Sequence, residues 1–184
     1  AEPASRGGMR SRAPGERIRV AYLSADFREH ATSYLAAGLF ERHDRAIFDT
    51  VAVSFAPKSD GAMARRLRAA FGSFLDVAEL GDREVSALLR GREVDIAVDL
   101  MGYTLHARPG VLASRPAPVQ VNYLGFPGTM GADWIDYILA DDYVISERCR
   151  RHYSEKVVAL PECFQVNDHA RPRPTGAPTR REAG

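Results

Sequence analysis

One loop brings together residue types that let a ligand approach the backbone at the end of a strand. The apolar run 119–124 ends at Leu124 and continues into Gly125, Phe126, Pro127, Gly128, Thr129, Met130 and Gly131. Glycine permits positive φ and close approach of a ligand, proline stiffens the turn, and the threonine hydroxyl lies beside backbone N–H groups. In an open α/β sheet, such strand ends hold ligands. The alternative is an ordinary strand-exit loop rich in turn-forming residues.

Polar residues also follow two other expected strands. The first strand is followed by Asp26 and His30, and the central strand by Gly102, Tyr103, Thr104, His106 and Arg108. The carboxyl ends of parallel strands lie on one edge of a sheet. We therefore expect these residues and the 125–131 loop to line a single crevice.

His30 is the candidate general base, because its unperturbed pKa, about 6.5, suits proton transfer near neutrality. Asp26, four residues earlier, is placed to orient it. The alternative is a histidine at the start of a helix that bonds to the backbone. The sequence leaves both interpretations open.

The sequence lacks the motifs of several enzyme classes. The residues after the first strand read Ser24-Ala25-Asp26-Phe27-Arg28 instead of GxGxxG, which disfavours a dinucleotide oxidoreductase. The sequence has no P-loop, no GxSxG elbow and no HExxH motif. Asp141 and Asp142 follow an apolar strand without a second ligand cluster, so we interpret them as a turn or helix cap and expect no metal site.

Composition and charge fit a globular protein without a nucleic-acid or membrane partner. Hydrophobic residues make up 45% and charged residues 27% of the 184 residues, and the formal net charge is +1. Cys149 and Cys163 match no CxxC or zinc spacing and are expected to be free thiols. The chain begins with no apolar signal segment, and no run approaches the roughly 20 apolar residues that span a bilayer. The expected location is the cytoplasm.

Strand and helix patterns alternate along the chain. Apolar or β-favouring runs predict strands at 18–23, 48–55, 74–77, 94–100, 119–124, 134–139 and 156–160. Helices are expected at 32–40, 63–71 and 109–113, and another after Asp82 as its cap. The alternation predicts an α/β fold: a Rossmann-like, mostly parallel sheet flanked by helices, with right-handed crossovers.

The ordered domain is expected to occupy residues 17–168. Residues 1–16 are rich in Pro, Gly, Ser and Arg and are expected to be a flexible lead or linker. Residues 169–184 contain no core-forming segment and are expected to cross toward a second half that this chain lacks.

An ordered series of motifs resembles one family, from about Arg17 to Asp168. The segments are Tyr22-Leu23-Ser24-Ala25-Asp26-Phe27 with His30, Gly102-Tyr103-Thr104, the run 115–129, Asp136-Tyr137, the run 153–156, and Phe164-Gln165-Val166-Asn167-Asp168. Together they are similar to the O-linked N-acetylglucosamine transferase family, glycosyltransferase family 41, including its SPINDLY-like and bacterial members.

The resemblance implies the N-terminal, acceptor-side half of a GT-B catalytic region. It further implies inverting, metal-independent transfer of N-acetylglucosamine from UDP-N-acetylglucosamine to Ser or Thr hydroxyls of an acceptor protein or peptide. The nucleotide sugar is then a substrate, and no cofactor is expected. The missing C-terminal half would supply most nucleotide contacts, so the chain alone is expected to be inactive. In the family, tetratricopeptide repeats usually precede the catalytic region.

The resemblance also assigns site residues. His30 matches the histidine beside the acceptor hydroxyl, as base or as positioning group. The matching substrate-binding residues are Tyr103, Thr104, Leu124, Gly125, Phe126, Pro127, Gly128 and Thr129. The sequence departs from some members at Tyr34, where they have histidine, at Met101, where they have asparagine, and at Phe126, where tyrosine is common.

Two other functions stay open. One is protein O-fucosyl transfer from GDP-fucose, as in SPINDLY-like members, which share these motifs. The other is a non-enzymatic Rossmann-like binding module whose exposed apolar surface favours association.

Overall fold

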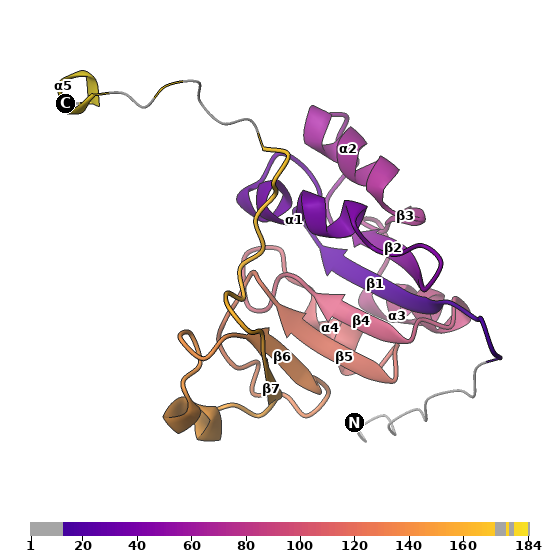
Figure 1. Ribbon diagram of the computed structural model, residues 1–184. Helices are drawn as coiled ribbons and strands as arrows, with labels where there is room; N and C mark the ends of the chain where they lie inside the picture. The colour runs from indigo at the N-terminus through magenta and orange to yellow at the C-terminus, as the bar shows by residue number, and fades with distance from the viewer. Residues whose placement is uncertain (1–12, 172–175, 177–178, 184) are drawn as a thin grey trace.

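A computed structural model describes residues 13–171, 176 and 179–183, and a seven-stranded parallel sheet forms its centre (Figure 1). The strand order is β3-β2-β1-β4-β5-β6-β7. The strands are β1 (Ile18–Ser24), β2 (Phe48–Ser54), β3 (Ser73–Asp76), β4 (Ile96–Asp99), β5 (Val119–Tyr123), β6 (Tyr137–Ala140) and β7 (Lys156–Ala159). The order reverses between β1 and β4, which makes this gap the switch point where such sheets bind ligands.

Helices cover both faces of the sheet. Their bounds are α1 (Ala31–Glu41), α2 (Ala62–Ala70), α3 (Asp82–Gly91), α4 (Pro109–Ala113), the 3-10 helix η1 (Glu147–His152) and α5 (Arg180–Ala183). Figure 1 shows α1 and α2 on one side of the strands and α3 and α4 on the other. Phe40 of α1 and Leu67 of α2 share a core with Val98, whereas Leu89 of α3 and Leu112 of α4 share the opposite core with Leu23.

The apolar runs of the central strands explain why both faces are covered. In β1, Val20 and Tyr22 pack into the α1 side, and Ala21 and Leu23 pack into the α3 side. A strand whose alternate side chains are all buried needs a helix layer above and below it. The α/β prediction is therefore confirmed.

The strand and helix positions expected from the sequence agree with the structure apart from local boundaries. Ile96 begins β4, two residues after Val94, and Tyr137 begins β6, three residues after Trp134. The cap of α3 is Gly81 and not Asp82. The Gly81 N–H donates to the Glu84 carboxylate at 2.7 Å, which closes the first turn and leaves Asp82 free to bind another segment.

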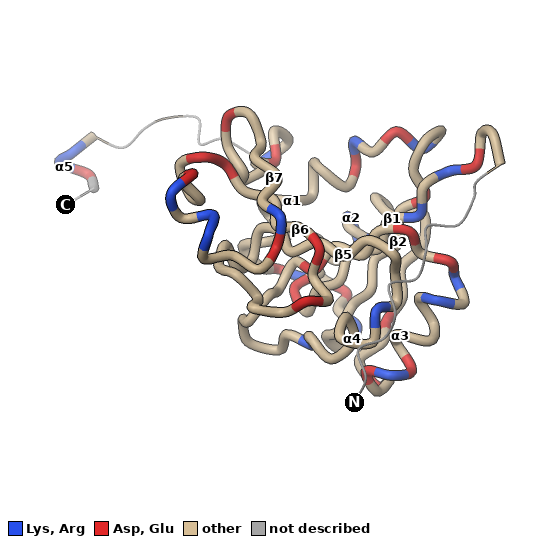
Figure 2. Tube along the Cα trace, turned by 90° about the horizontal axis from the view of Figure 1, so that it is seen from below, with Lys and Arg blue, Asp and Glu red and all other residues tan. Residues whose placement is uncertain are grey.

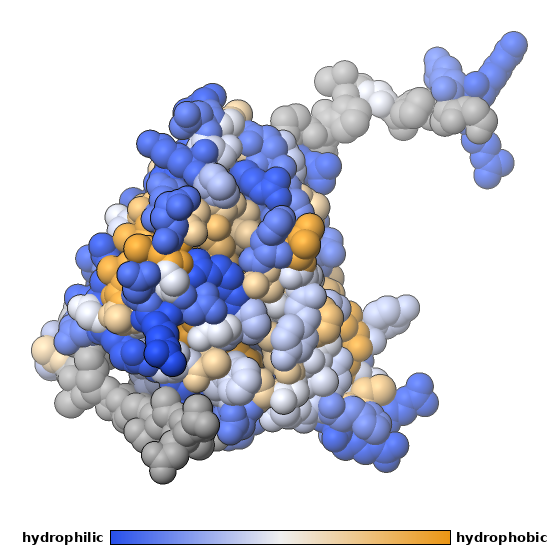
Figure 3. Space-filling model, turned by 180° about the vertical axis from the view of Figure 1, so that it is seen from behind, coloured by the Kyte–Doolittle hydropathy of each residue, from blue (hydrophilic) through white to orange (hydrophobic). Residues whose placement is uncertain are grey.

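Charges lie around the sheet rather than within it. Figure 2 shows Lys and Arg mixed with Asp and Glu along the loops and helices, while the central strands carry few of either. Figure 3 shows the α3 and α4 side, where hydrophobic atoms form separate groups among hydrophilic ones. No helix in the described part of the chain is long and apolar enough to cross a bilayer.

After β7 the chain returns over the α1 side of the sheet as a strap, residues 160–171. Leu160, Phe164 and Val166 pack against the core on that side. The Tyr123 hydroxyl donates to the Phe164 carbonyl at 2.8 Å, and the Asp141 carboxylate accepts the Phe164 N–H at 2.8 Å. The strap therefore completes the α1-side layer over β5 and β6.

Two expectations concern the ends of the chain, the flexible lead and the crossover tail, and both stay predictions. Of the proposed lead at 1–16, residues 1–12 lie outside the described residues, and so do 172–175, 177–178 and 184 of the proposed crossover tail. The described part of that tail contains α5, whose Arg180, Arg181 and Glu182 are exposed.

An ionic cluster fixes the end of the strap to α1 and α2. The Arg66 guanidinium binds the Asp168 carboxylate at 2.6 Å and the Glu41 carboxylate at 2.7 Å, and the Asp168 side chain is only 2% exposed. The hydrogen bonds from Arg66 lower the pKa of Asp168 and of Glu41. Both carboxylates are therefore stabilised in their charged form by folding.

Replacing Arg66 by methionine should lower the free energy of unfolding at pH 7 by about 1–3 kcal/mol, because it leaves the buried Asp168 carboxylate without its cation. The two carboxyls have lower pKa values when folded, so their contribution is present at neutral pH and lost as pH falls through those values. Urea unfolding should show the difference from wild type shrinking as pH falls below the ordinary pKa of a carboxyl, about 4.

The matched control is Arg83→Met on the exposed side of α3. Equal stability losses in the two variants, or a loss for Arg66→Met that does not depend on pH, would show that the cluster does not hold the strap.

Candidate functional site

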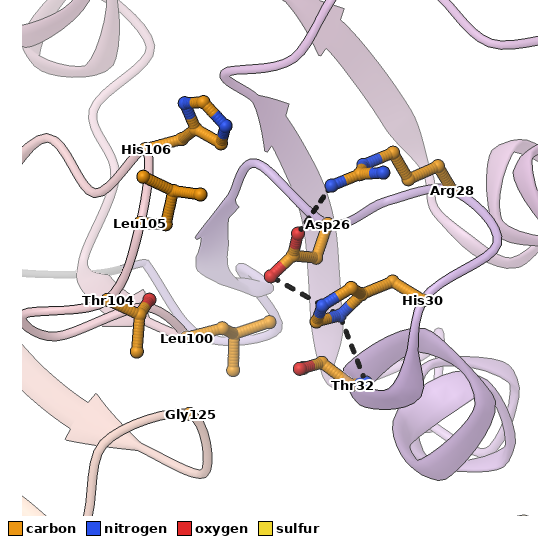
Figure 4. Close-up of a pocket in the computed structure, with 9 residues that line it drawn as sticks. All are labelled: Asp26, Arg28, His30, Thr32, Leu100, Thr104, Leu105, His106 and Gly125. Atoms are coloured by element: carbon orange, nitrogen blue, oxygen red, sulfur yellow. Dashed lines mark hydrogen bonds and ion pairs between the residues drawn. The ribbon is translucent and has the colours of Figure 1, made fainter.

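A pocket opens at the switch point, between the carboxyl ends of β1 and β4 (Figure 4). Its volume is about 250 Å³, and it is lined by Asp26, Arg28, His30, Thr32, Leu100, Thr104, Leu105, His106 and Gly125. These residues come from the three loops that follow β1, β4 and β5 and, in the case of Thr32, from the first turn of α1. The expected single crevice is confirmed for five residues, which lie around one space: Asp26, His30, Thr104, His106 and Gly125.

His30 makes two contacts, one with the backbone at the start of a helix and one with Asp26. It is the N-cap of α1, and its Nδ1 accepts the Thr32 N–H at 3.3 Å. The same Nδ1 lies 3.4 Å from the Asp26 carboxylate (Figure 4). A neutral imidazole carries its proton on one nitrogen, so the two contacts favour different tautomers. The Thr32 contact favours a proton on Nε2, and the Asp26 contact favours a proton on Nδ1.

The two contacts have different chemical consequences. A proton on Nδ1 leaves the Nε2 lone pair free to accept a proton from a substrate hydroxyl. A proton on Nε2 makes His30 a hydrogen-bond donor. When His30 gains a proton, Nδ1–H must find an acceptor, and the Asp26 carboxylate is that acceptor. The pair can therefore orient a hydroxyl and also hold its proton.

Contacts with other residues also hold Asp26 in place beside His30. Its side chain is 11% exposed, and its carboxylate lies 3.4 Å from the Arg28 guanidinium. Its N–H donates to Ser24 Oγ at 2.9 Å, and its carbonyl accepts the Ser33 hydroxyl. The turn after β1 is therefore tied both to the strand and to the first turn of α1.

Glu29 connects this turn to α2. Its carboxylate accepts the Met63 N–H at 2.9 Å, and it lies over Gly61, where a Cβ would come within 2.1 Å of Glu29 Oε2. An anion at a helix N-terminus satisfies free N–H groups and the helix dipole. His30 therefore follows a residue fixed to another helix, which limits how far its loop can move.

The loop after β4 turns sharply so that Thr104 reaches the pocket. Gly102 has φ of +60°, and a Cβ there would lie 2.3 Å from Phe126 Cβ. The Thr104 hydroxyl donates to the Met101 carbonyl at 2.9 Å. The Tyr103 hydroxyl donates to the Met130 carbonyl at 2.7 Å, which ties this loop to the loop after β5.

The loop after β5 begins with a tight γ-turn. The Gly125 N–H donates to the Tyr123 carbonyl at 2.9 Å, and Leu124 between them has φ of +71°. This form of γ-turn is rare and strained, so the surrounding structure must hold it. Gly125 itself lies against β4, where a Cβ would come within 2.1 Å of the Leu100 carbonyl oxygen.

The glycines of this loop act differently from the expectation. Of the three, only Gly131 has positive φ, +58°, and Leu124 takes the left-handed conformation instead. Gly125 is needed for close packing against Leu100, and Gly128 lies against the Phe126 ring. At Gly125 and Gly128 the absence of a side chain allows close packing, and neither glycine is needed for a positive φ.

Thr129 uses its hydroxyl within the loop. It donates to the Glu155 carboxylate at 2.7 Å and accepts the Gly131 N–H at 3.0 Å. Glu155 is 4% exposed and also accepts the Met130 N–H. The Thr129 hydroxyl therefore stabilises the loop through contacts with three residues, the third being Ser154, whose hydroxyl lies at 3.2 Å and whose N–H lies at 3.3 Å.

The predicted residues fall into two groups. His30, Thr104 and Gly125 line the pocket. The others lie in the same two loops but are absent from its lining: Tyr103, Leu124, Phe126, Pro127, Gly128 and Thr129. Tyr103 stacks edge-on against Phe126 with ring centroids 5.8 Å apart, so this group shapes the wall behind the pocket.

Arg108 and the Asp141-Asp142 pair lie elsewhere. The Arg108 guanidinium binds Asp82 and the carbonyls of Val77 and Leu80, on the α3 side and outside the crevice where it was expected. Asp141 accepts three backbone N–H groups, which lower its pKa, and so forms the expected turn. Within the described residues, no three His, Cys, Asp or Glu side chains form a potential metal site.

Sequence reasoning missed four residues of the lining: Arg28, Thr32, Leu100 and Leu105. Each is adjacent to a motif residue or one position removed, so their place on the strand-end loops was the available signal. Leu105 is 80% exposed, and His106 beside it has φ of +66°. The rim of the pocket therefore includes one exposed apolar side chain.

Comparison with known proteins identifies similar chains. The family model described as glycosyl transferase family 41 matches residues 6–174. The probable UDP-N-acetylglucosamine–peptide N-acetylglucosaminyltransferase SEC of Arabidopsis thaliana is 35% identical over 154 residues, which are 84% of this chain and 16% of that protein. The corresponding protein named SPINDLY of the same plant is 30% identical over 82% of this chain and 17% of its own length.

A solved structure has the same fold. The K341M mutant of the O-GlcNAc transferase of Thermobaculum terrenum superposes with a TM-score of 0.79 and 33% identity, covering 90% of this chain and 30% of that one. The UDP-N-acetylglucosamine–peptide N-acetylglucosaminyltransferase of Caenorhabditis elegans is 31% identical over 85% of this chain and 14% of its length. The chain therefore spans less than one fifth of these curated relatives.

Replacing Gly125 by alanine should lower the free energy of unfolding by about 1–3 kcal/mol, because the new methyl group overlaps the Leu100 carbonyl. Urea unfolding checks this, with Gly91→Ala at the end of α3 as the matched control, since a Cβ there meets no atom within 4 Å. If both variants are equally stable, Gly125 does not lie as close to the Leu100 carbonyl as described.

Proposed function

Because the chain belongs to glycosyltransferase family 41, we propose that it is the acceptor-side half of the catalytic region of a protein O-glycosyltransferase. The reaction is transfer of N-acetylglucosamine from UDP-N-acetylglucosamine to a Ser or Thr hydroxyl. The observation that carries the proposal is the pocket at the switch point, where the His30–Asp26 pair faces Thr104 and Gly125 across one space. The printed names of the similar proteins describe the same donor and a peptide acceptor.

The transfer needs a nucleophile whose proton has somewhere to go. The acceptor oxygen forms a bond to the anomeric carbon, the bond from that carbon to the diphosphate breaks, and the nucleoside diphosphate leaves with the bonding pair. The hydroxyl proton passes to His30 Nε2 or to a diphosphate oxygen. In the first case the Asp26 carboxylate stabilises the imidazolium, and in the second His30 still fixes the direction of the hydroxyl.

The leaving diphosphate gains negative charge as the bond breaks. Donors that point at this charge before the reaction lower the barrier most. Around the pocket, Arg28 provides a fixed positive charge and His106 an imidazole on the opposite side (Figure 4). We propose that the second half of the catalytic region, absent from this chain, completes the donor site and that this half alone is inactive.

The decisive experiment uses the complete protein with UDP-N-acetylglucosamine and, separately, GDP-fucose, with sugar transfer to a peptide library read by mass spectrometry. N-acetylglucosamine on Ser or Thr is the expected product. Replacing His30 by alanine should lower kcat by about 10²–10⁴-fold, the usual contribution of a group that positions or accepts a proton.

If only fucose is transferred, the donor is GDP-fucose instead of UDP-N-acetylglucosamine, and the proposed reaction class, protein O-glycosyl transfer, still holds. If a folded protein binds neither nucleotide sugar and yields no product, the transferase proposal is wrong and a binding module is favoured. Calorimetric titration with each nucleotide sugar separates these cases.

Asp26→Asn should lower kcat by about tenfold or more, because an amide cannot stabilise the imidazolium by charge. In a His30→Ala background the same change should have little further effect, since the two residues act as a unit. Asp133→Asn, an exposed aspartate in the β5–β6 connection, is the control. Independent, multiplicative losses at residues 26 and 30 would show that Asp26 does not act through His30.

A further inference from the structure

Asp99, the last residue of β4, is a buried acidic residue that the proposed reaction does not use. It is 4% exposed. Its Oδ1 accepts the Met101 N–H at 3.0 Å, and its Oδ2 accepts the Gly102 N–H at 3.1 Å. Within the described chain, both partners of the carboxylate are therefore backbone donors, and none of the ion pairs involves it.

These two bonds fix the sharpest turn of the pocket wall. Gly102, with positive φ, packs against Phe126, and the Thr104 hydroxyl bonds back to the Met101 carbonyl. Thr104 and the two residues that follow it line the pocket. The position of this wall therefore depends on the turn that the Asp99 carboxylate holds.

Asn122 holds the neighbouring loop in the same manner. It is the register partner of Asp99 on β5, so both side chains leave the sheet on one face. Its Nδ2 donates to the carbonyls of Phe126 at 3.0 Å and Gly128 at 3.2 Å. Its Oδ1 is buried and has no hydrogen-bond partner in the described structure, so an acceptor lies beside Asp99.

We propose that Asp99 is a positioning residue of the pocket: its buried carboxylate holds the Met101–Gly102 turn and thereby places Thr104, Leu105 and His106 against the substrate. The proposal rests on the proposed function for the identity of that substrate. The geometry of the turn can be tested without it.

The energetics favour a role in positioning over one in stability. Burial raises the pKa of Asp99 to about 6, although the two N–H bonds act in the opposite direction. The folded pKa exceeds the unfolded one, so the folded chain binds the proton more tightly between about pH 4 and pH 6. Stability therefore falls as pH rises through this range, and the ionised carboxylate is retained at a cost to the fold.

Other titratable groups surround this turn. They are Asp26 and His30 after β1, Tyr103 and His106 in the same loop, and Arg108 before α4. Arg108 is bound to Asp82. The 124–131 loop, packed against the turn, contains no titratable side chain. A titration must therefore be assigned by observing Asp99 itself.

The first test follows the wild-type chain by NMR from pH 8 to pH 4.5. The Asp99 carboxyl carbon should titrate with a midpoint near pH 6, and the amide protons of Met101 and Gly102 should move with the same midpoint. The proposal is overturned if Asp99 titrates while neither amide responds. It is also overturned if both amides titrate with the midpoint of a histidine instead.

The second test is Asp99→Asn with Asp142→Asn as the control, since the Asp142 side chain is 77% exposed. Loss of the charged acceptor should speed hydrogen exchange of the Met101 and Gly102 amides by about tenfold or more. Exchange of the Val98 amide in β4 reports whether the sheet itself opens. Unchanged exchange at both turn amides overturns the proposal, and so does an equal increase at Val98.

The third test uses the complete protein. Asp99→Asn should lower kcat for sugar transfer by about tenfold and remove the contribution of Asp99, near pH 6, from the acid limb of its pH profile. Altered exchange with unaltered transfer would overturn the positioning role while leaving the turn as described. If wild type transfers no sugar, the proposed function fails separately, and the NMR tests still decide whether Asp99 holds the wall.

Discussion

In-register parallel pairing of β1, β4 and β5 is the constraint on which the rest of the structure depends. Leu23 pairs with Asp99, and Asp99 pairs with Asn122, so three chain segments leave the sheet at the same level. A shift of one residue would turn Asp99 to the opposite face of the sheet and away from its turn. The pocket exists because this register places the loops after the three strands side by side.

Buried polar side chains then give these loops a fixed form. Asp99, Asn122 and Glu155 bind backbone groups of the pocket wall, while Glu29 binds the start of α2. Unsatisfied buried groups are costly, so each anchor favours a single loop conformation. The pocket is thus preorganised before any substrate arrives, which is the condition for effective alignment of a hydroxyl nucleophile.

The strap at the end of the domain is also held by buried side chains. Its apolar side chains complete the α1-side layer, and the Arg66 cluster fixes its last buried residue, Asp168. A segment that led to a second catalytic half would therefore depart from a fixed point on α1 and α2.

The sequence by itself determined the alternation of strands and helices, the sheet class and the crevice that contains His30, Thr104 and Gly125, because periodicity and turn-forming residues are local properties. It could not show that Thr129 binds Glu155, that Arg108 leaves the crevice, or that Leu124 and not Gly125 takes positive φ. Those outcomes depend on partners 26 residues away, or on packing against Leu100, and only the tertiary structure brings these groups within contact distance. The same holds for Asp99, since its burial and its place in the sheet register give it its role.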